Sequence, residues 1–481
     1  MNPETRSLHE DFIRTFYRLV HMTKIHQENN QLLIKCIEDF KQVIGPLLVD
    51  DDNITIQISR ENIYLQDKKL HYRRELDSLI NNLLQYLEKR NLKGIRFSID
   101  IQDASDKEII AFSRTLNNTE QQTDPLDWLV QQLENQGIIW AEVIHAQDMP
   151  LEEETLEAAP QDQVQERKDK ARKAYFYALD SLKEVAQKIS FKKKVGARKC
   201  IRVIQNMVDL VMEDEPVILG ISTIRDYDDY TFTHSINVAI LSMCLGQRIG
   251  LSRKSLHRLG LCGLFHDLGK LDIPIEIINQ PKKLSQSEFE EIKKHSIHSV
   301  TQIIKLQTAR DLKAKILLPP FEHHMKYDLS GYPKTKRKKP VSLFGRIITI
   351  SDVFDAITSP RIYRKSAFSP DQALNKMLGG AGTDFDPILL KIFINMLGVY
   401  PIGSLLELDT GELGLVMDSG EKIDGARPMV VLLVADGQGG YTKGGVADLA
   451  ERDAQSGAFR RNIVKSIHPS TRGIQAAEFL I

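Results

Sequence analysis

The chain has 481 residues, which is more than one hydrophobic core usually organises, so we expect about three domains. Its 64 Lys and Arg residues balance 65 Asp and Glu residues, a formal net charge of -1 that argues against polymeric nucleic acid as the main partner. The four cysteines lie far apart with no Cys-x-x-Cys pair, which argues against a disulfide framework and against a thiolate zinc site.

Residues 1–150 are predicted to form a small α+β domain with a regulatory or dimerising role. Apolar positions at helical spacing between about residues 6 and 47 indicate one long helix or two shorter ones. The segments ITIQIS and IYLQ alternate around a turn at residues 59–62, which predicts a β-hairpin. A helix near residues 75–90, the strand GIRFSID, a helix at 107–116 and a strand around 138–144 complete the expected domain.

Three further regions follow along the chain. Residues 151–170 are charged and poor in large apolar side chains, a composition typical of a linker. From 171 to 400, amphipathic segments such as CIRVIQNMVDLVM predict an almost wholly helical domain. Residues 401–481 show short apolar alternations between Gly and Asp turns, which predict a β-rich C-terminal module. The expected fold class is therefore mainly α, with a small α+β domain before the helical domain and a short β-rich module after it.

The helical region also holds a concentration of histidines. Seven of the thirteen histidines lie between His234 and His324. The stretch LCGLFHDLGKLDIP carries His266 and Asp267 on an apolar run, and buried polar groups need partners such as a cation. Mixed imidazole and carboxylate donors suit iron, manganese or zinc better than calcium or magnesium. The candidate ligands are His234, His266, Asp267, His295, His323, His324 and Asp352.

Seven ligands are too many for one ion. A bridging carboxylate, most naturally Asp267, would allow two ions about 3.5–4 Å apart, which together activate a water and neutralise a phosphoryl oxygen. Some candidates also have a plain structural interpretation. His234 could be a core histidine with a backbone partner, and His295 could be a surface histidine, as we expect of His298. Asp355, one turn after Asp352, would either orient a ligand or pair with a basic residue.

An ordered series of motifs links these residues. It consists of His234, HDLGK (266–270), IPIEIINQP (273–281), His295, HHMKYDLSGYP (323–333) and SDVFDAITSPRIYR (351–364). In this order and spacing the chain resembles the HD-GYP family, a branch of the HD phosphohydrolase superfamily, over roughly residues 216–400. The resemblance implies a phosphodiesterase that hydrolyses cyclic di-GMP to pGpG, in some members onward to GMP. It also implies a binuclear or trinuclear site of divalent ions, iron or manganese, with the seven candidates as ligands.

The resemblance also implies roles for residues beyond the ligands. Lys270, predicted to be catalytic together with Asp267, would meet the scissile phosphate, where an ammonium stabilises developing oxyanion charge. Tyr332, in the Gly-Tyr-Pro loop, would face a guanine or a phosphate. Arg361 and Arg364 would contact the ligand, a role that guanidinium forks suit. The alternatives are an exposed helix charge for Lys270 and carboxylate pairing for the two arginines.

The sequence departs from the family pattern at three positions. Tyr230 stands where many members have a glutamate that binds a third metal, so a binuclear centre is expected, with loss of the step to GMP as a consequence. Leu329 replaces a common glycine before the Ser-Gly-Tyr-Pro loop, and Ile362 replaces a common proline. Both changes would alter the shape of a loop and its substrate preference, and neither removes a metal ligand.

The expected location and partners follow from the same observations. A polar N-terminus and the lack of a long apolar run predict a cytoplasmic chain with no direct membrane insertion. Cyclic di-GMP is the expected ligand, and a homodimer and a diguanylate cyclase or other signalling protein are further expected partners. Helix pairing through residues 171–215 is the expected route from the N-terminal domain to the active site. The competing functions are a receptor that binds cyclic di-GMP without hydrolysis and a hydrolase of another cyclic dinucleotide.

Overall fold

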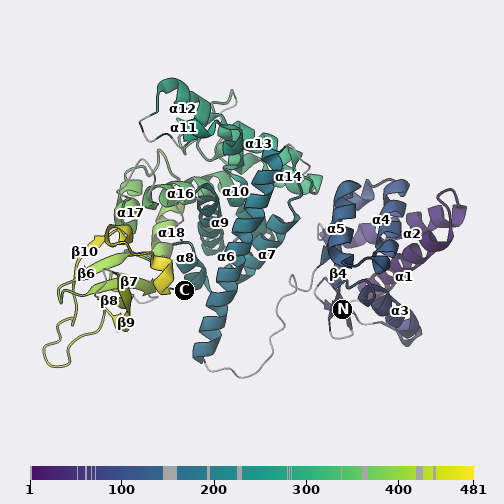
Figure 1. The fold of residues 1–481 in the computed structure, drawn as a ribbon, viewed down its shortest axis with the longest axis horizontal. Coiled ribbons are helices and arrows are strands. Elements are labelled where there is room, and N and C mark those ends of the chain that lie inside the picture. Colours follow the sequence, from purple (N-terminus) through teal and green to yellow (C-terminus); the bar gives the residue numbers. More distant parts are fainter. Residues whose placement is uncertain are drawn as a thin grey trace. The chain divides into compact units, whose positions relative to one another are not determined.

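The computed structural model describes residues 3–50, 53–59, 62–66, 68–70, 72–144, 160–191, 195–224, 230–278, 280, 282, 284–336, 339–359, 367–418, 426–436 and 440–480. The chain divides into two compact units. Unit 1 contains Met1–Leu156 with Gln307–Lys313, and unit 2 contains Glu157–Leu306 with Ala314–Ile481. Figure 1 labels their helices and strands.

Unit 1 is an α+β fold built on a five-stranded antiparallel sheet of order β3-β2-β1-β4-β5. Its strands are β1 (Asn53–Ser59), β2 (Asn62–Leu65), β3 (Lys68–Lys69), β4 (Gly94–Ser98) and β5 (Ala141–Ile144). Its α-helices are α1 (Pro3–Ile25), α2 (Gln31–Asp50), α3 (Asp77–Glu88), α4 (Asp106–Asn118) and α5 (Pro125–Asn135). The predicted hairpin is confirmed, because Ser59 of β1 lies opposite Asn62 of β2.

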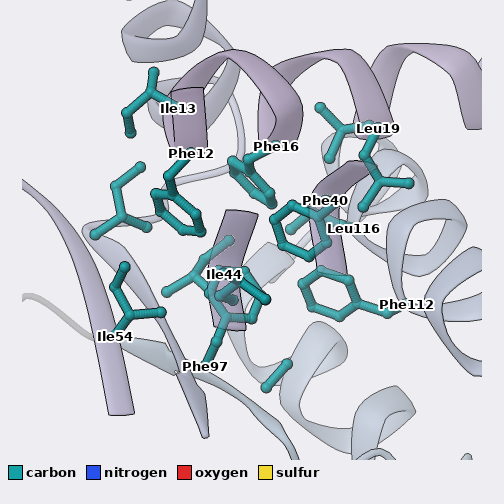
Figure 2. Close-up of a cluster of buried hydrophobic side chains, with 14 of the residues drawn as sticks. Phe12, Ile13, Phe16, Leu19, Phe40, Ile44, Ile54, Phe97, Phe112 and Leu116 are labelled. Carbon is teal, nitrogen blue, oxygen red and sulfur yellow. The ribbon is translucent and has the colours of Figure 1, made fainter. Parts of the chain in front are cut away.

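Aromatic side chains fill the core of unit 1 (Figure 2). Phe12 and Phe16 of α1 and Phe40 of α2 meet Phe97 of β4 edge-on, with ring centroids 5.6–6.2 Å apart. Phe112 of α4 contacts the same ring at 5.8 Å. Edge-to-face pairs add about 0.5–1.5 kcal/mol each to the burial of apolar area. One ring from the sheet therefore ties three helices to the core.

The helical stretch predicted between residues 6 and 47 is two helices. The Asn30 side chain accepts a hydrogen bond from the backbone N–H of Leu32 at 2.8 Å and so caps the start of α2. The sequence analysis missed α5. Within that helix, Leu129 and Leu133 are buried one turn apart, and most of the remaining positions are polar.

Unit 2 is mainly helical, as predicted. Its longer α-helices are α6 (Pro160–Ser190), α7 (Arg198–Glu213), α9 (Tyr230–Arg248), α10 (Arg253–Phe265), α12 (Gln286–Lys293), α13 (His295–Lys305), α16 (Leu343–Thr358), α17 (Pro370–Leu378) and α18 (Pro387–Leu397). The shorter ones are α8 (Glu215–Ile221), α11 (Ile275–Ile278), α14 (Arg310–Ile316), α15 (Leu318–Glu322) and α19 (Ala476–Leu480), with α14 shared between the two units. The 3-10 helix η5 (Leu268–Asp272) follows α10.

The C-terminal part of unit 2 is the expected β-rich region. Its antiparallel sheet has the order β10-β6-β7-β8-β9. The strands are β6 (Leu405–Leu408), β7 (Leu413–Asp418), β8 (Met429–Ala435), β9 (Tyr441–Asp448) and β10 (Ile463–Ile467). A small apolar cluster that includes Leu406, Val416 and Val430 holds the sheet together.

The structure differs from the predicted linker over residues 160–170. Helix α6 begins at Pro160 and continues for 31 residues, packing against α7, α8 and α9 (Figure 1). Proline suits the first helical position, and Gln, Glu, Lys and Arg are good helix formers, so a charged composition alone does not separate a linker from a solvated helix. Residues 151–159 of the predicted linker lie outside the described part of the chain. Within that described part, no helix combines the length and the apolar character that a membrane crossing requires.

Candidate metal centre

Five helices of unit 2 bring the seven predicted ligands into one cluster. The ligands come from five places: His234 from α9, His266 and Asp267 from directly after α10, His295 from the start of α13, His323 and His324 from directly after α15, and Asp352 from α16. Six of them are buried, and the His324 side chain is 26% exposed. Their donor atoms form three overlapping groups within each of which all atoms lie within 4.8 Å of one another. These groups are His234–His266–Asp352, His295–His323–His324 and His266–Asp267–His323.

Three of the histidines are oriented by the backbone at a helix end. In each case Nδ1 faces the carbonyl oxygen three residues earlier: Gly263 for His266 at 2.7 Å, Ile292 for His295 at 2.6 Å and Pro320 for His323 at 2.7 Å. The last carbonyls of a helix have no partner within it, so they are available to accept these bonds. An Nδ1–H that donates to a carbonyl leaves Nε2 as the lone pair that can bind a metal.

His234 is oriented differently because it lies inside α9 instead of at a helix end. Its Nδ1 lies 2.7 Å from Oδ2 of Asp355, and its Nε2 lies 3.0 Å from Oδ1 of Asp352. Of the two roles considered for Asp355, the geometry matches orientation of a ligand. The alternative of a core histidine with a backbone partner does not match these contacts.

Asp267 lies between the two groups of ligands that share no residue. Its Oδ2 is 3.3 Å from Nε2 of His266 and 3.8 Å from Nε2 of His234, while its Oδ1 is 3.5 Å from Nε2 of His295. Oδ1 of Asp267 and Nε2 of His266 are buried and have no hydrogen-bond partner among the described residues. An unpaired buried polar atom is costly, and a divalent cation would satisfy both atoms. The donor set therefore fits a metal.

The charges of the cluster also suit a cation. Burial alone would raise the pKa of Asp267, but Lys270 and His266 outweigh it and hold the pKa well below its ordinary value. Burial lowers the pKa of His323 well below its ordinary value and lowers that of His324 to about 3. Ionised carboxylates and neutral imidazoles are the forms that bind metal. The pKa of His234 behaves oppositely: burial lowers it, but the hydrogen bonds to Asp352 and Asp355 raise it to about 9.

Lys270 reaches the cluster from η5. Its Nζ lies 2.5 Å from Oδ2 of Asp267, and a quarter of its side chain is exposed. Lys270 does not share an α-helical face with His266, because α10 ends at Phe265 and residues 268–272 form a 3-10 helix. The ammonium nevertheless lies at the cluster, as expected, because the tighter turn directs it to the carboxylate three residues earlier.

A close approach between η5 and α13 sets the position of His295, and the sequence analysis missed it. A Cβ atom on Gly269 would lie 2.1 Å from the carbonyl oxygen of His295, so only glycine fits there. The buried Ser299 hydroxyl accepts a bond from the N–H of Gly269 at 2.8 Å and donates to the carbonyl of His266 at 2.7 Å. Ser299 therefore joins the two segments that carry His266 and His295.

The Gly-Tyr-Pro loop lies against His324. Backbone N–H of Tyr332 donates to the His324 carbonyl at 2.9 Å, and a Cβ on Gly331 would lie 2.0 Å from that oxygen. The Tyr332 ring centroid is 4.7 Å from that of His324 and 6.3 Å from that of Phe289. The ammonium of Lys293 lies 5.8 Å from the Tyr332 ring centroid. Phe289 and Lys293 were not predicted, since nothing in the sequence brings α12 to this loop.

Two departures from the motif pattern have structural counterparts. The Tyr230 ring stacks on His234, with centroids 5.6 Å apart and planes 8° apart. Leu329 has a φ of 64°, a left-handed conformation that glycine adopts at no steric cost. Arg361, Ile362 and Arg364 lie outside the described residues.

A family model matches part of the helical region. Residues 219–389, which include all seven predicted ligands, match the family described as HD domain. A cyclic di-GMP phosphodiesterase of Pseudomonas aeruginosa is 32% identical over 208 residues, which are 43% of this chain and 49% of that protein. A cyclic di-GMP phosphodiesterase of Borreliella burgdorferi is 30% identical over 193 residues, 40% of this chain and 50% of that protein.

A third relative carries a different substrate in its name. The 3'3'-cGAMP-specific phosphodiesterase 1 of Vibrio cholerae is 38% identical over 150 residues, which are 31% of this chain and 33% of that protein. The chain thus spans at most about half the length of these three relatives.

Proposed function

We propose that residues 219–389, which match the HD domain family, form a catalytic domain of the HD-GYP type, and that this protein is a metal-dependent phosphodiesterase that hydrolyses cyclic di-GMP to pGpG. One observation carries the proposal. Two groups of three metal-binding side chains share no residue, and Asp267 lies between them with one buried oxygen that has no hydrogen-bond partner among the described residues. This arrangement supports a pair of ions instead of a single one.

Each group of three would hold one ion. His234, His266 and Asp352 would be the ligands of the first ion, His295, His323 and His324 would be those of the second, and Asp267 would contribute its carboxylate between the two groups. When bound, such a pair supplies an activated water and neutralises a phosphoryl oxygen. The mixed imidazole and carboxylate donors suit iron, manganese or zinc, and the family resemblance favours iron or manganese among these. The stacked ring of Tyr230 at the third-metal position supports a binuclear centre and hydrolysis that ends at pGpG.

The chain's other residues would bind and orient the nucleotide. Lys270 holds Asp267 ionised and is partly exposed, so its ammonium can also contact a nonbridging phosphate oxygen. Tyr332 and Phe289 present aromatic rings beside the ligand cluster, where a guanine can stack. Lys293 lies over both rings and places a second cation there.

A second substrate is favoured by one comparison and one local feature. The relative from Vibrio cholerae is named for 3'3'-cGAMP, and Leu329 gives the segment before Gly331 a left-handed residue other than glycine. The same centre would then hydrolyse a cyclic dinucleotide with one adenine. A receptor that binds without hydrolysis is the remaining alternative. The homodimer, the diguanylate cyclase partner and a cytoplasmic location stay predictions.

The test is a product assay with a matched pair of histidine variants. The full chain, reconstituted anaerobically with iron or manganese, is incubated with cyclic di-GMP or 3'3'-cGAMP, and products are quantified by chromatography. His295→Ala should abolish pGpG formation. The control is His298→Ala, one turn along α13, where the side chain is 32% exposed and faces Asp272 instead of the cluster. Its activity should stay within about twofold of the wild type.

Three outcomes separate the alternatives. Faster turnover of 3'3'-cGAMP would change the substrate and keep the centre. Tight binding of intact nucleotide by metal-loaded protein without product would instead identify a receptor. Equal activity of the His295→Ala and His298→Ala variants would refute the ligand set.

A further inference from the structure

A chain of buried hydrogen bonds connects α6 to the proposed metal centre. The Tyr175 hydroxyl, on α6, donates to Oδ1 of Asn237 at 3.2 Å, and Nδ2 of Asn237 donates to Oδ1 of Asp355 at 3.2 Å. The other oxygen of Asp355 faces Nδ1 of His234 at 2.7 Å. All four residues are at most 2% exposed. This series of hydrogen bonds runs from α6 to Asn237 of α9, then to Asp355 of α16, and returns to α9 at His234, a candidate ligand.

The donors and acceptors along this chain have one consistent assignment. Asn237 must present its amide nitrogen to Asp355, because two oxygens would repel each other, and the second hydrogen of that nitrogen goes to the Ile224 carbonyl at 3.3 Å. Oδ1 of Asn237 is then an acceptor, and Tyr175 must donate to it. On the other side, Asp355 can only accept from Nδ1–H of His234. The tautomer that leaves Nε2 of His234 to a metal is thus set by this series of contacts.

His234 differs in this respect from the other oriented histidines. Backbone carbonyls three residues earlier, at the ends of α10, α12 and α15, hold His266, His295 and His323, so those rings keep their orientation as long as these helix ends persist. Among these four histidines, only His234 has its Nδ1 held by a side chain, that of Asp355, which belongs to another helix. Its orientation therefore depends on how α6, α9 and α16 pack together, and α6 packs directly against α9.

We propose that Tyr175 is a positioning residue: acting through Asn237 and Asp355, it holds the ring of His234, so that the placement of α6 sets the metal affinity of one half of the centre. The inference rests on the proposed metal centre. Along the chain, α6 is the first described element after residue 144 of unit 1. A shift of α6 would lower the affinity for the ion held by His234, His266 and Asp352. The affinity for the ion held by His295, His323 and His324 would not change.

The test measures metal affinity separately for the two ions. Metal-stripped full-length protein is titrated with Mn²⁺, and free Mn²⁺ is followed by electron paramagnetic resonance. Tyr175→Phe removes one hydroxyl and should lower the affinity for one of the two ions about 3- to 10-fold, which corresponds to the free energy of a single hydrogen bond. The affinity for the other ion should not change. The matched control is Tyr177→Phe, which removes the same hydroxyl from a ring of α6 that is 41% exposed and should leave both affinities unchanged.

A second variant separates positioning from general packing. Asn237→Asp keeps the side-chain shape but places a carboxylate against Asp355, so it should weaken the same ion by more than Tyr175→Phe does. In the double variant the link is already broken, and Tyr175→Phe should add no further loss. Substitution of Co²⁺ gives a visible ligand-field spectrum that should change in both single variants and not in Tyr177→Phe. Circular dichroism at each titration end point establishes that the variants are folded.

The possible results divide clearly. Unchanged affinities in Tyr175→Phe would overturn the inference while leaving the proposed function intact. Equal weakening of both ions, or additive losses in the double variant, would assign Tyr175 to packing instead of positioning. Failure of the wild type to bind Mn²⁺ at all would refute the metal centre itself, and the inference with it.

Discussion

The core of unit 1 and the ligand cluster of unit 2 are both buried, but they are held together in different ways. Phe97 and His266 are each 0% exposed. Around Phe97 the contacts are between apolar rings, and another apolar side chain could partly replace them. Around His266 the contacts are directional: Nδ1 faces the Gly263 carbonyl at 2.7 Å, and Nε2 lies 3.3 Å from Oδ2 of Asp267. A change in the first region should alter stability, whereas a change in the second should alter chemistry.

The largest expected effect is the loss of turnover in Asp267→Ala. Removing the residue that lies between the two ligand groups should uncouple the ions and reduce kcat at least about 1000-fold, as removal of central catalytic groups does elsewhere. The helical fold should remain, because Asp267 contributes no apolar packing. The assay is pGpG formation together with thermal unfolding of the metal-free protein. Full activity in this variant would show that the ions do not depend on Asp267.

The converse substitution is Phe97→Ala in unit 1. It should lower the free energy of unfolding of that unit by about 3–4 kcal/mol, because a ring that contacts several others leaves a cavity. Turnover per folded molecule should be unchanged. Chemical denaturation measures the first quantity and steady-state kinetics the second. Leu32→Ala, at a position that is 54% exposed, is the control and should cost little. A clear fall in turnover per folded molecule would show that this core also affects the chemistry, and would contradict the distinction between the two regions.

Gly269→Ala should produce an intermediate effect by packing alone. The added methyl group would meet the carbonyl oxygen of His295 at 2.1 Å and force η5 away from α13. Asp267 and His295 would then separate, and we expect metal affinity to fall about 10- to 100-fold, the loss seen when the groups that orient ligands are removed. Gly445→Ala, where a Cβ meets nothing within 4 Å, is the matched control. Metal titration of both variants tests this, and equal affinities would contradict the close approach.

The metal-free protein should be most stable near pH 6.5. Burial lowers the pKa of His323 and of His295 below the ordinary value of 6.5, so in acid the unfolded chain binds protons that the folded chain does not. The free energy of unfolding then rises with pH, by up to about 1.4 kcal/mol per pH unit for each histidine. For His234, whose pKa is raised to about 9, the stabilisation is complete below 6.5 and is lost between 6.5 and 9.

Urea unfolding of chelator-treated protein at pH 5, 6.5 and 9 measures this curve. Lower stability at both ends is expected. A steady rise in stability from pH 5 to 9 would show that His234 is not paired with the two aspartates, and a steady fall would show that His323 and His295 do not stay neutral.

The smallest expected effect is that of Leu329→Gly. It removes the cost of a left-handed leucine but adds the chain entropy of glycine, so stability should change by less than about 1 kcal/mol. If the loop shape sets substrate preference, the ratio of kcat/KM for cyclic di-GMP and 3'3'-cGAMP should shift more than the stability does. An unchanged ratio would remove Leu329 from the determinants of specificity.

The sequence could predict the seven candidate ligands that the structure brings into one cluster because their motifs are local and ordered. HDLGK and SDVFDAIT each carry polar residues on apolar runs, and burial of such residues signals a site. The hairpin at Ser59 and Asn62 was predictable for a similar reason, since both of its strands and the turn are contiguous.

The remaining parts depend on packing between distant segments. In the sequence, nothing distinguishes Ser299 and Asn237 from other polar helix residues. Their roles follow from the contact of η5 with α13 and of α6 with α9. The composition of residues 160–170 is equally compatible with a linker and with a helix, and contacts with the rest of unit 2 decide between them. The 3-10 turn after Phe265 depends likewise on the close contact at Gly269.

The most direct test of the central claim is the magnetic coupling of bound metal. The full-length protein is stripped, loaded with Mn²⁺ to saturation, and examined by metal analysis and low-temperature electron paramagnetic resonance. Two groups of three ligands bridged by Asp267 predict two ions per chain and the spectrum of an exchange-coupled pair, which Asp267→Ala should convert to uncoupled signals. One ion per chain, or two ions with no coupling in the wild type, would contradict the bridged centre.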